Sequence, residues 1–235
     1  MSRLNLIGGA AVAALLAMAG PAAADEGMWT FDHFPAAKVQ QAYGVSIDQK
    51  WLDRVQAASV RLTSGCSASL VSKDGLVFSN HHCVVDCAQE LSTGKTDYVK
   101  DGFLAATRAD EKKCAGMQAE VLTSITDVTA RVTDAGAGKS GQDFVKARDA
   151  AIATIEAEGC AKDPKFRCQV VTLYRGGQYK LYKFRKYADV RLVFAPEFAT
   201  AFFGGDPDNF NFPRYNLDVS FVRLYEDGKP VATSQ

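Results

Sequence analysis

The chain has 235 residues, and its 27 lysines and arginines are balanced by 27 aspartates and glutamates. A protein without a strong field of one sign has no electrostatic reason to bind nucleic acid or an anionic membrane surface. The composition therefore argues against these two classes of partner. The length suffices for one domain with a sizeable core or for two small ones.

The N-terminal residues 1–24 have the pattern of a secretory signal peptide. Arg3 is followed by an apolar run over residues 4–19 and by the small residues 22–24, which resemble a cleavage site. The apolar run is too short, and too soon followed by Asp25, for stable membrane insertion. We therefore expect the signal peptide to be removed and the mature chain to be periplasmic, in a Gram-negative bacterium, or secreted.

Six cysteines in an exported chain predict disulfides, because an oxidising compartment allows them to form. Sequence proximity and the layout of the cysteine-containing motifs favour three pairs among the many that six thiols allow: Cys66 with Cys83, Cys87 with Cys114, and Cys160 with Cys168. The first pair would stabilise the fold by roughly 3 kcal/mol in the chain-entropy model.

Residues 35–62 are predicted to be helical in two pieces. Gly44 ends the first piece, and Ser46 can cap the second, in which apolar residues recur at helical spacing. Residues 67–79 then predict a β-hairpin, because apolar stretches flank a turn at residues 73–75.

The second half of the chain is predicted to be mostly β-structure. A strand followed by a turn is expected over residues 120–132, and the strongest helix over residues 140–158, with Gly159 as its stop signal. Four strands separated by turn residues follow, at 169–174, 180–184, 190–194 and 219–225. Short strands joined by turns indicate a barrel or a sandwich.

The most informative motif is Ser-Asn-His-His-Cys at residues 79–83. Its cysteine stands 17 residues after Cys66, and two of the three histidines of the chain, His81 and His82, are adjacent in it. This layout is similar to the region of the general base in chymotrypsin-type serine peptidases, where the residue before the disulfide cysteine points into the cleft. His82 is therefore the candidate base, and His81 is expected to point away from it and to pack.

A catalytic imidazole needs a carboxylate that holds it in the correct tautomer. Asp218 opens the apolar strand over residues 219–224, and it follows His82 in the chain, as the chymotrypsin type requires. Asp218 is therefore the candidate for the orienting carboxylate.

A nucleophilic serine is not evident. Ser140 lies in the glycine-rich stretch 136–141, but it precedes Asp218, which is the wrong order for this type of barrel. A phosphate-binding loop would need a glycine where Thr133 stands. Ser140 and Asp143 instead predict a helix N-cap and its capping-box partner.

A metal site is the competing interpretation of the motif, because zinc binds cysteine and histidine, here His81, His82, Cys83 and Cys87. Adjacent His-His-Cys residues are poorly spaced for one ion, and export favours disulfides. We therefore expect neither a metal nor another cofactor.

Three stretches carry a specific resemblance to a known family. They are Gly-Leu-Val-Phe-Ser-Asn-His-His-Cys at residues 75–83, Leu-Tyr-Lys-Phe-Arg-Lys-Tyr-Ala-Asp-Val-Arg-Leu-Val at 181–193, and Gly-Gly-Asp-Pro-Asp-Asn-Phe with Pro-Arg-Tyr within 204–215. Residues 25–235 resemble the bacterial dipeptidyl-peptidases 7 and 11, which are serine exopeptidases of the chymotrypsin clan. Members of that family are several hundred residues long. Their second barrel half, with the serine and the oxyanion hole, follows a large helical insertion.

The resemblance implies a mainly β fold with helical additions. Residues 25–235 would form a chymotrypsin-like β-barrel half, truncated before the helical insertion and the second barrel. His82 would be the general base and Asp218 its orienting carboxylate. Asn209 falls where the family binds the free α-amino group of the peptide, with an Asx-type turn as its structural alternative. Phe210 falls where the family commonly has a tryptophan, so it keeps an aromatic wall but lacks the indole N–H.

The expected function is that of a serine dipeptidyl-peptidase, which releases dipeptides from the free N-terminus of peptide substrates. The chain alone is expected to be inactive, because the nucleophile and the residues that select the side chain beside the scissile bond would lie in the missing part. The alternatives are an inactive fragment or a non-catalytic peptide-binding module, and a structural domain stabilised by disulfides. A homodimer of the full-length form is left open.

Overall fold

The computed structural model describes residues 27–161, 163–205 and 213–233. The expected signal peptide lies outside the described residues. Residues 27–35 belong to a first unit, in which Phe31–His33 form the 3-10 helix η1, and the second unit begins at Ala36. Within the described ranges, no helix combines the length and the apolar character needed to cross a bilayer.

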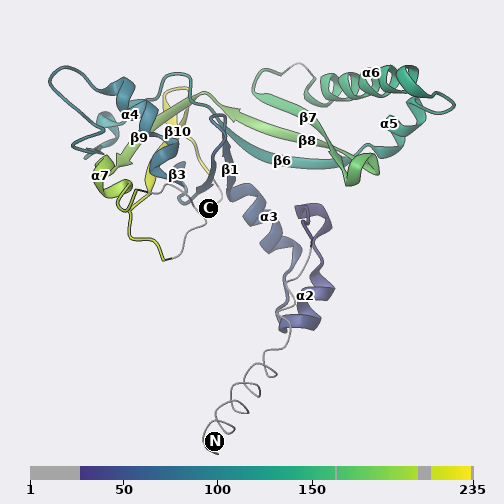
Figure 1. The fold of residues 1–235 in the computed structure, drawn as a ribbon, viewed down its shortest axis with the longest axis horizontal. Helices are drawn as coiled ribbons and strands as arrows, with labels where there is room; N and C mark the ends of the chain where they lie inside the picture. The colour runs from purple at the N-terminus through teal and green to yellow at the C-terminus, as the bar shows by residue number, and fades with distance from the viewer. Residues whose placement is uncertain (1–26, 162, 206–212, 234–235) are drawn as a thin grey trace, which may run out of the picture. The chain divides into compact units, whose positions relative to one another are not determined.

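The second unit is mainly antiparallel β-structure with several helices, as expected from the sequence. One sheet has the strand order β4-β9-β10-β3-β2-β1-β6-β8-β7, with β5 paired to β9 and β11 paired to β10 (Figure 1). Its strands are β1 (Ser59–Leu62), β2 (Ser67–Leu70), β3 (Leu76–Ser79), β4 (Phe103–Leu104), β5 (Lys112–Lys113), β6 (Ala119–Asp127), β7 (Phe166–Leu173), β8 (Gln178–Tyr187), β9 (Asp189–Ala195), β10 (Ser220–Glu226) and β11 (Lys229–Pro230).

The helices are short, apart from α6. They are α2 (Ala36–Tyr43), α3 (Gln49–Ala58), α4 (Val85–Leu91), α5 (Thr129–Ala135), α6 (Gly141–Cys160) and α7 (Phe198–Ala201), with the 3-10 helices η2 (His81–Cys83), η3 (Arg108–Asp110) and η4 (Tyr174–Gly176). Helices α5 and α6 contact each other and strands β7 and β8 (Figure 1).

Two hydrophobic cores stabilise this unit. The first core is built from β1, β2, β3, β6, β9, β10 and α4, and its fully buried members include Leu62, Val77, Leu192, Val222 and Leu224. The second core lies between α5, α6 and the β7–β8 strands and consists of Val128, Val132, Ile155, Val170 and Tyr179. Burial of each such aliphatic side chain contributes about 1.5–3 kcal/mol to stability.

The region 35–62 departs from the sequence prediction in two ways. Helix α3 is capped by Asp48, whose Oδ1 accepts a 2.7 Å hydrogen bond from the backbone N–H of Trp51, and not by Ser46. The helix also ends at Ala58, because the following residues form β1 and pair with both β2 and β6. Sheet pairing that buries alternate residues outweighs helix propensity here.

The region 120–160 differs from the prediction at its boundaries. Residues 129–135 form the helix α5 where a turn was expected. Helix α6 continues through Gly159 to Cys160, so the glycine does not end the helix. A Cβ at this position would lie 2.7 Å from Leu181 Cδ2, so the glycine permits close packing against β8. Ser140 occupies the N-cap position, but its side chain makes no capping hydrogen bond.

Turn chemistry accounts for two hairpins. Strands β2 and β3 pair antiparallel, as expected for residues 67–79. Strands β10 and β11 are joined by Asp227 and Gly228, which have φ values of 51° and 74°. Positive φ at both central residues is the conformation that Asp-Gly favours in a tight hairpin.

Candidate active site

Disulfides fix the segment that carries the adjacent histidines. Cys83, in η2 at the end of β3, is bonded to Cys66, which precedes β2. Cys87 in α4 is bonded to Cys114, and Cys160 at the end of α6 is bonded to Cys168 in β7. These are the three pairs expected from the sequence. The first two hold η2 and α4 against the first core.

The register of two strands brings Asp218 to His82. Strands β3 and β10 pair antiparallel, with Ser79 opposite Ser220. In an antiparallel pair, the residues that follow one strand lie beside those that precede its partner. Asp218 thus lies next to the Asn80–His82 segment, although 136 residues separate it from His82.

The carboxylate of Asp218 binds His82 at two points. His82 Nδ1 lies 2.8 Å from Oδ2 of Asp218, and the backbone N–H of His82 donates a 3.1 Å hydrogen bond to Oδ1. The Asp218 side chain is only 7% exposed, whereas that of His82 is 38% exposed. The arrangement therefore combines a buried, fixed carboxylate with an imidazole that is open to a ligand.

Asn80 is part of the site, and the sequence analysis did not assign it a role. Its Nδ2 donates to the backbone carbonyl of Asp218 at 3.0 Å and lies 3.2 Å from Oδ2. The hydroxyl of Ser220, which is fully buried, donates a 2.7 Å hydrogen bond to the carbonyl of Asn80. Asn80 thus ties the two strand ends together and orients the carboxylate. Its position directly before the histidine pair is the signal that could have revealed it.

His81 is buried, with 2% of its surface exposed, and its ring lies 6.1 Å from that of Phe198. Burial lowers the pKa of His81, and the negative charge of Asp218 opposes that effect only in part. His81 is therefore a neutral packing residue at neutral pH, which agrees with the expectation that it packs.

The sequence also offered Asn209, Phe210 and Ser140 as residues to be considered. Asn209 and Phe210 fall outside the described residues. Ser140 precedes α6, whose buried residue Ile155 belongs to the second core, and it is not hydrogen-bonded to His82. Its placement agrees with the interpretation of Ser140 as a helix-start residue.

The histidine–cysteine motif does not offer a ready metal site. Within the described part of the chain, one cysteine–histidine group has its ligand atoms within 4.8 Å of one another: Cys66, His82 and Cys83. The two sulfurs of that group are joined in a disulfide, and the metal ligand is the thiolate form of cysteine. Cys87, from the set considered in the sequence, is bonded to Cys114.

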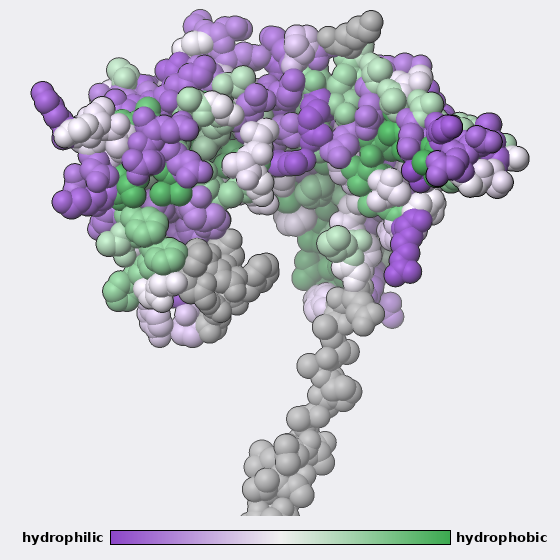
Figure 2. Space-filling view, turned by 45° about the horizontal axis from the view of Figure 1, so that its top comes forward, coloured by the Kyte–Doolittle hydropathy of each residue, from purple (hydrophilic) through white to green (hydrophobic). Residues whose placement is uncertain are grey.

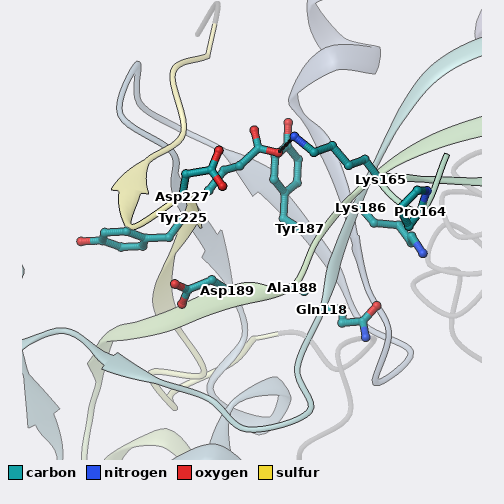
Figure 3. Close-up of a pocket in the computed structure, with 10 residues that line it drawn as sticks. Gln118, Pro164, Lys165, Lys186, Tyr187, Ala188, Asp189, Tyr225 and Asp227 are labelled. Atoms are coloured by element: carbon teal, nitrogen blue, oxygen red, sulfur yellow. Dashed lines mark ion pairs between the residues drawn. The ribbon is translucent and has the colours of Figure 1, made fainter.

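A separate pocket lies away from the histidines, next to β8, β9 and β10 (Figure 3). It has a volume of about 360 Å³, and Lys165 and Glu226 form an ion pair of 3.2 Å across it. The other lining residues are Gln118, Pro164, Lys186, Tyr187, Ala188, Asp189, Tyr225 and Asp227. The face of the molecule in Figure 2 mixes hydrophilic residues with small hydrophobic groups. The His82–Asp218 pair is the stronger candidate site, because an imidazole held by a buried carboxylate has a defined role in proton transfer.

A disulfide-anchored histidine whose Nδ1 meets a buried carboxylate, at the ends of two paired antiparallel strands, has the geometry expected of the histidine–aspartate pair of a serine peptidase. The comparison with protein families agrees with this class. The family model described as peptidase S46 matches residues 24–235, so the chain belongs to the peptidase S46 family.

Relatives in this family are dipeptidyl-peptidases. The Asp/Glu-specific dipeptidyl-peptidase of Porphyromonas endodontalis is 33% identical over 225 residues, covering 90% of this chain and 31% of the relative. Dipeptidyl-peptidase 7 of Porphyromonas gingivalis is 31% identical over 246 residues, covering 100% of this chain and 34% of the relative. This chain therefore spans about a third of the length of these relatives.

The fold is also similar to that of a solved structure. The crystal structure of Porphyromonas endodontalis DPP11 in complex with the dipeptide Arg-Glu aligns with a TM-score of 0.73 and 32% sequence identity. The alignment covers 90% of this chain and 33% of that protein. The antiparallel sheet and its helices therefore correspond to part of the DPP11 fold.

Proposed function

We propose that this chain supplies the general base and its orienting carboxylate to a serine dipeptidyl-peptidase. The observation that carries the proposal is the 2.8 Å contact between His82 Nδ1 and Asp218 Oδ2, with Asp218 buried and His82 exposed. The names of the relatives, which are dipeptidyl-peptidases, support the same reaction class.

In the proposed mechanism, Asp218 keeps the proton of neutral His82 on Nδ1, so that Nε2 is free to accept a proton. Nε2 takes the hydroxyl proton of a serine as its oxygen attacks the carbonyl carbon of the second peptide residue. The imidazolium then gives this proton to the leaving amine as the peptide bond breaks. Water, deprotonated by the same nitrogen, hydrolyses the acyl-enzyme and releases the dipeptide.

The nucleophilic serine of this proposal belongs to the part of the relatives' length that this chain does not span. Among the residues that the structure describes, the recorded hydrogen bonds of His82 go to Asp218 and none goes to a serine hydroxyl. We therefore propose that the 235-residue chain does not turn over peptides alone. Most of the rate enhancement needs the catalytic residues to act together.

The restriction to N-terminal dipeptides is proposed from the family resemblance. Asn209 would bind the free α-amino group of the peptide, and Phe210 would form an aromatic wall of the same subsite. An anchored amine fixes the distance to the scissile bond, and this positioning selects the second peptide bond for attack. We also propose that the chain is exported after removal of residues 1–24, which the three disulfides support.

The test compares variants of the protein that the complete gene encodes, using dipeptidyl-coumarin substrates. His82→Ala and Asp218→Asn should each lower kcat by about 10⁴-fold, because the base or its correct tautomer is lost. The exposed His33 and Asp101 provide matched controls, and His33→Ala and Asp101→Asn should leave kcat unchanged. Substrates with a blocked N-terminus should not be cleaved. Wild-type activity that survives His82→Ala would contradict the proposal.

Peptide binding without catalysis is the competing function. It predicts that the complete protein binds peptides with a free N-terminus and that His82→Ala leaves their Kd unchanged, with no hydrolysis by the wild type. Clear hydrolysis by the wild type excludes this alternative.

A further inference from the structure

The segment that leads into β10 places an arginine beside the buried carboxylate of the site. Arg214 Nη2 lies 3.6 Å from Asp218 Oδ2, and the arginine side chain is 23% exposed. Within the described ranges, Arg214 is the one lysine or arginine that forms an ion pair with Asp218. We propose that Arg214 is a positioning residue, which acts on His82 through Asp218. This inference rests on the proposed function, since it assigns a role within the same site.

A buried carboxylate needs compensation for its charge. The Asp218 side chain is 7% exposed, and removal of a charge from water is unfavourable unless the charge is paired and hydrogen-bonded. The backbone N–H of His82 and the amide of Asn80 donate hydrogen bonds to it but carry no charge. The imidazole of a general base is also neutral before the reaction. Arg214 thus supplies the permanent positive charge beside this buried carboxylate in the resting site.

The two partners of Asp218 Oδ2 lie at different distances and have different roles. His82 Nδ1 is at hydrogen-bond distance, 2.8 Å, whereas Arg214 Nη2 is at ion-pair distance, 3.6 Å. Arg214 therefore stabilises the charge of the carboxylate without replacing His82 as the group that the oxygen orients. A direct arginine–carboxylate hydrogen bond would compete with the imidazole for the same oxygen.

The guanidinium group is held in this position by its own turn. Arg214 Nε donates a 3.1 Å hydrogen bond to Oδ1 of Asn216, two residues later. Residues 213–219 are not helical, so the Arg214–Asp218 contact does not arise from helix periodicity. The planar guanidinium group offers several donors in fixed directions, which lets it contact Asn216 and Asp218 at once. A lysine ammonium would keep the charge but lose this fixed direction.

The first experiment needs no catalysis and uses the 235-residue chain. Long-range proton–nitrogen NMR correlations report which ring nitrogen of His82 carries the proton. Arg214→Gln should lower the share of the Nδ1-protonated tautomer, and Arg214→Lys should restore most of it. If Arg214→Gln does not fold, Arg214→Met serves as the second variant, because it also removes the charge but keeps a long side chain. An unchanged His82 spectrum in a folded Arg214→Gln or Arg214→Met protein would overturn the proposal.

The second experiment uses the complete enzyme and dipeptidyl-coumarin substrates. Arg214→Gln should lower kcat by about 10- to 100-fold through misplacement of the base, with little change in KM. Arg214→Lys should restore most of the lost kcat. Arg131→Gln, which removes an exposed arginine paired with Glu158, is the matched control and should change neither quantity. An inactive wild type would refute the proposed function and leave the NMR result to decide on Arg214. An active Arg214→Gln variant with the wild-type kcat would refute the role of Arg214.

Discussion

The first and second cores differ in how the chain assembles them. The first core joins β3 to β10, so that Ser79 lies opposite Ser220, and it positions His82 beside Asp218. The second core is built from residues 128–181, which follow one another closely in the chain. None of its buried residues contributes to the His82–Asp218 contact. The site therefore depends on long-range pairing, while the second core is a locally assembled attachment to the same sheet.

This difference has an energetic consequence. Closing a long loop has a larger entropic cost than closing a short one, and contacts between distant residues form only after that cost is met. We therefore expect the second core to open and close while β3 and β10 stay paired. Regions that open separately in this way can be detected by amide hydrogen exchange.

The largest effect on stability is expected from cavities in the two cores. Leu192→Ala in the first core and Ile155→Ala in the second should each lower the free energy of unfolding by about 2–5 kcal/mol, since both side chains are almost fully buried. Amide hydrogen exchange should distinguish the two variants by which amides lose protection. Leu192→Ala should expose amides throughout the sheet, whereas Ile155→Ala should expose mainly those of α5, α6 and β7. Equal loss of protection in β3 and β10 for both variants would show that the two cores form one cooperative unit.

Removal of single disulfides also compares the two regions, and the NMR signals of His82 report the effect at the site. Cys66–Cys83 closes a sequence separation of 17 residues and Cys160–Cys168 one of 8. Replacing each pair by serines should lower stability by about 3 and about 2.5 kcal/mol, respectively, in the chain-entropy model. Despite these similar losses, only the first replacement should change the NMR signals of the His82 ring, because only Cys83 adjoins it. A change of the His82 signals after loss of Cys160–Cys168 would contradict the separation of the two regions.

Much of the local structure follows from sequence patterns. The Ser67–Ser79 hairpin, the three disulfide pairs and the prominence of His82 depend on turn residues and cysteine spacing, which act over short stretches. The helix cap at Asp48 was missed because Ser46 is an equally suitable cap by type, and the pairing of β1 decides where the helix ends.

The surroundings of Asp218 could not be predicted in the same way. Asn80 meets its carboxylate because the register of β3 against β10 aligns segments 138 residues apart, whereas Arg214 precedes Asp218 in the same segment and is oriented by its hydrogen bond to Asn216. Hydrophobic alternation predicts that each strand exists, but it does not specify which residues before and after the strands become neighbours. The pairing of His82 with Asp218 was expected from chain order and family resemblance. The contacts of Asn80 and Arg214 with Asp218 became evident only from the three-dimensional structure.

Burial of His81 beside the site should make stability depend on pH. Burial lowers the pKa of His81 below its ordinary value of 6.5, so the unfolded chain binds the proton at a higher pH than the folded one. The contribution of neutral His81 to the free energy of unfolding is therefore complete above about pH 6.5. It is lost as the pH falls, and the free energy of unfolding changes by at most about 1.4 kcal/mol per pH unit. Denaturant unfolding at several pH values should show a flatter profile for His81→Gln. The exposed His33 is the control, and a profile flattened equally by His33→Gln would refute this origin.

The smallest effect is expected at the outer edge of the second core. Strand β7 ends the sheet, and Glu156 in α6 accepts a 2.7 Å hydrogen bond from the backbone N–H of Val170 in that strand. Glu156→Ala should lower stability by about 1 kcal/mol, because a partly buried N–H loses its acceptor. An unblocked edge also invites pairing with another chain, so the variant should self-associate more readily in sedimentation experiments. Glu158→Ala, on the same helix, removes an exposed ion pair with Arg131 and should cost at most about 0.5 kcal/mol without promoting association. Equal behaviour of the two variants would mean that Glu156 does not protect the edge of the sheet.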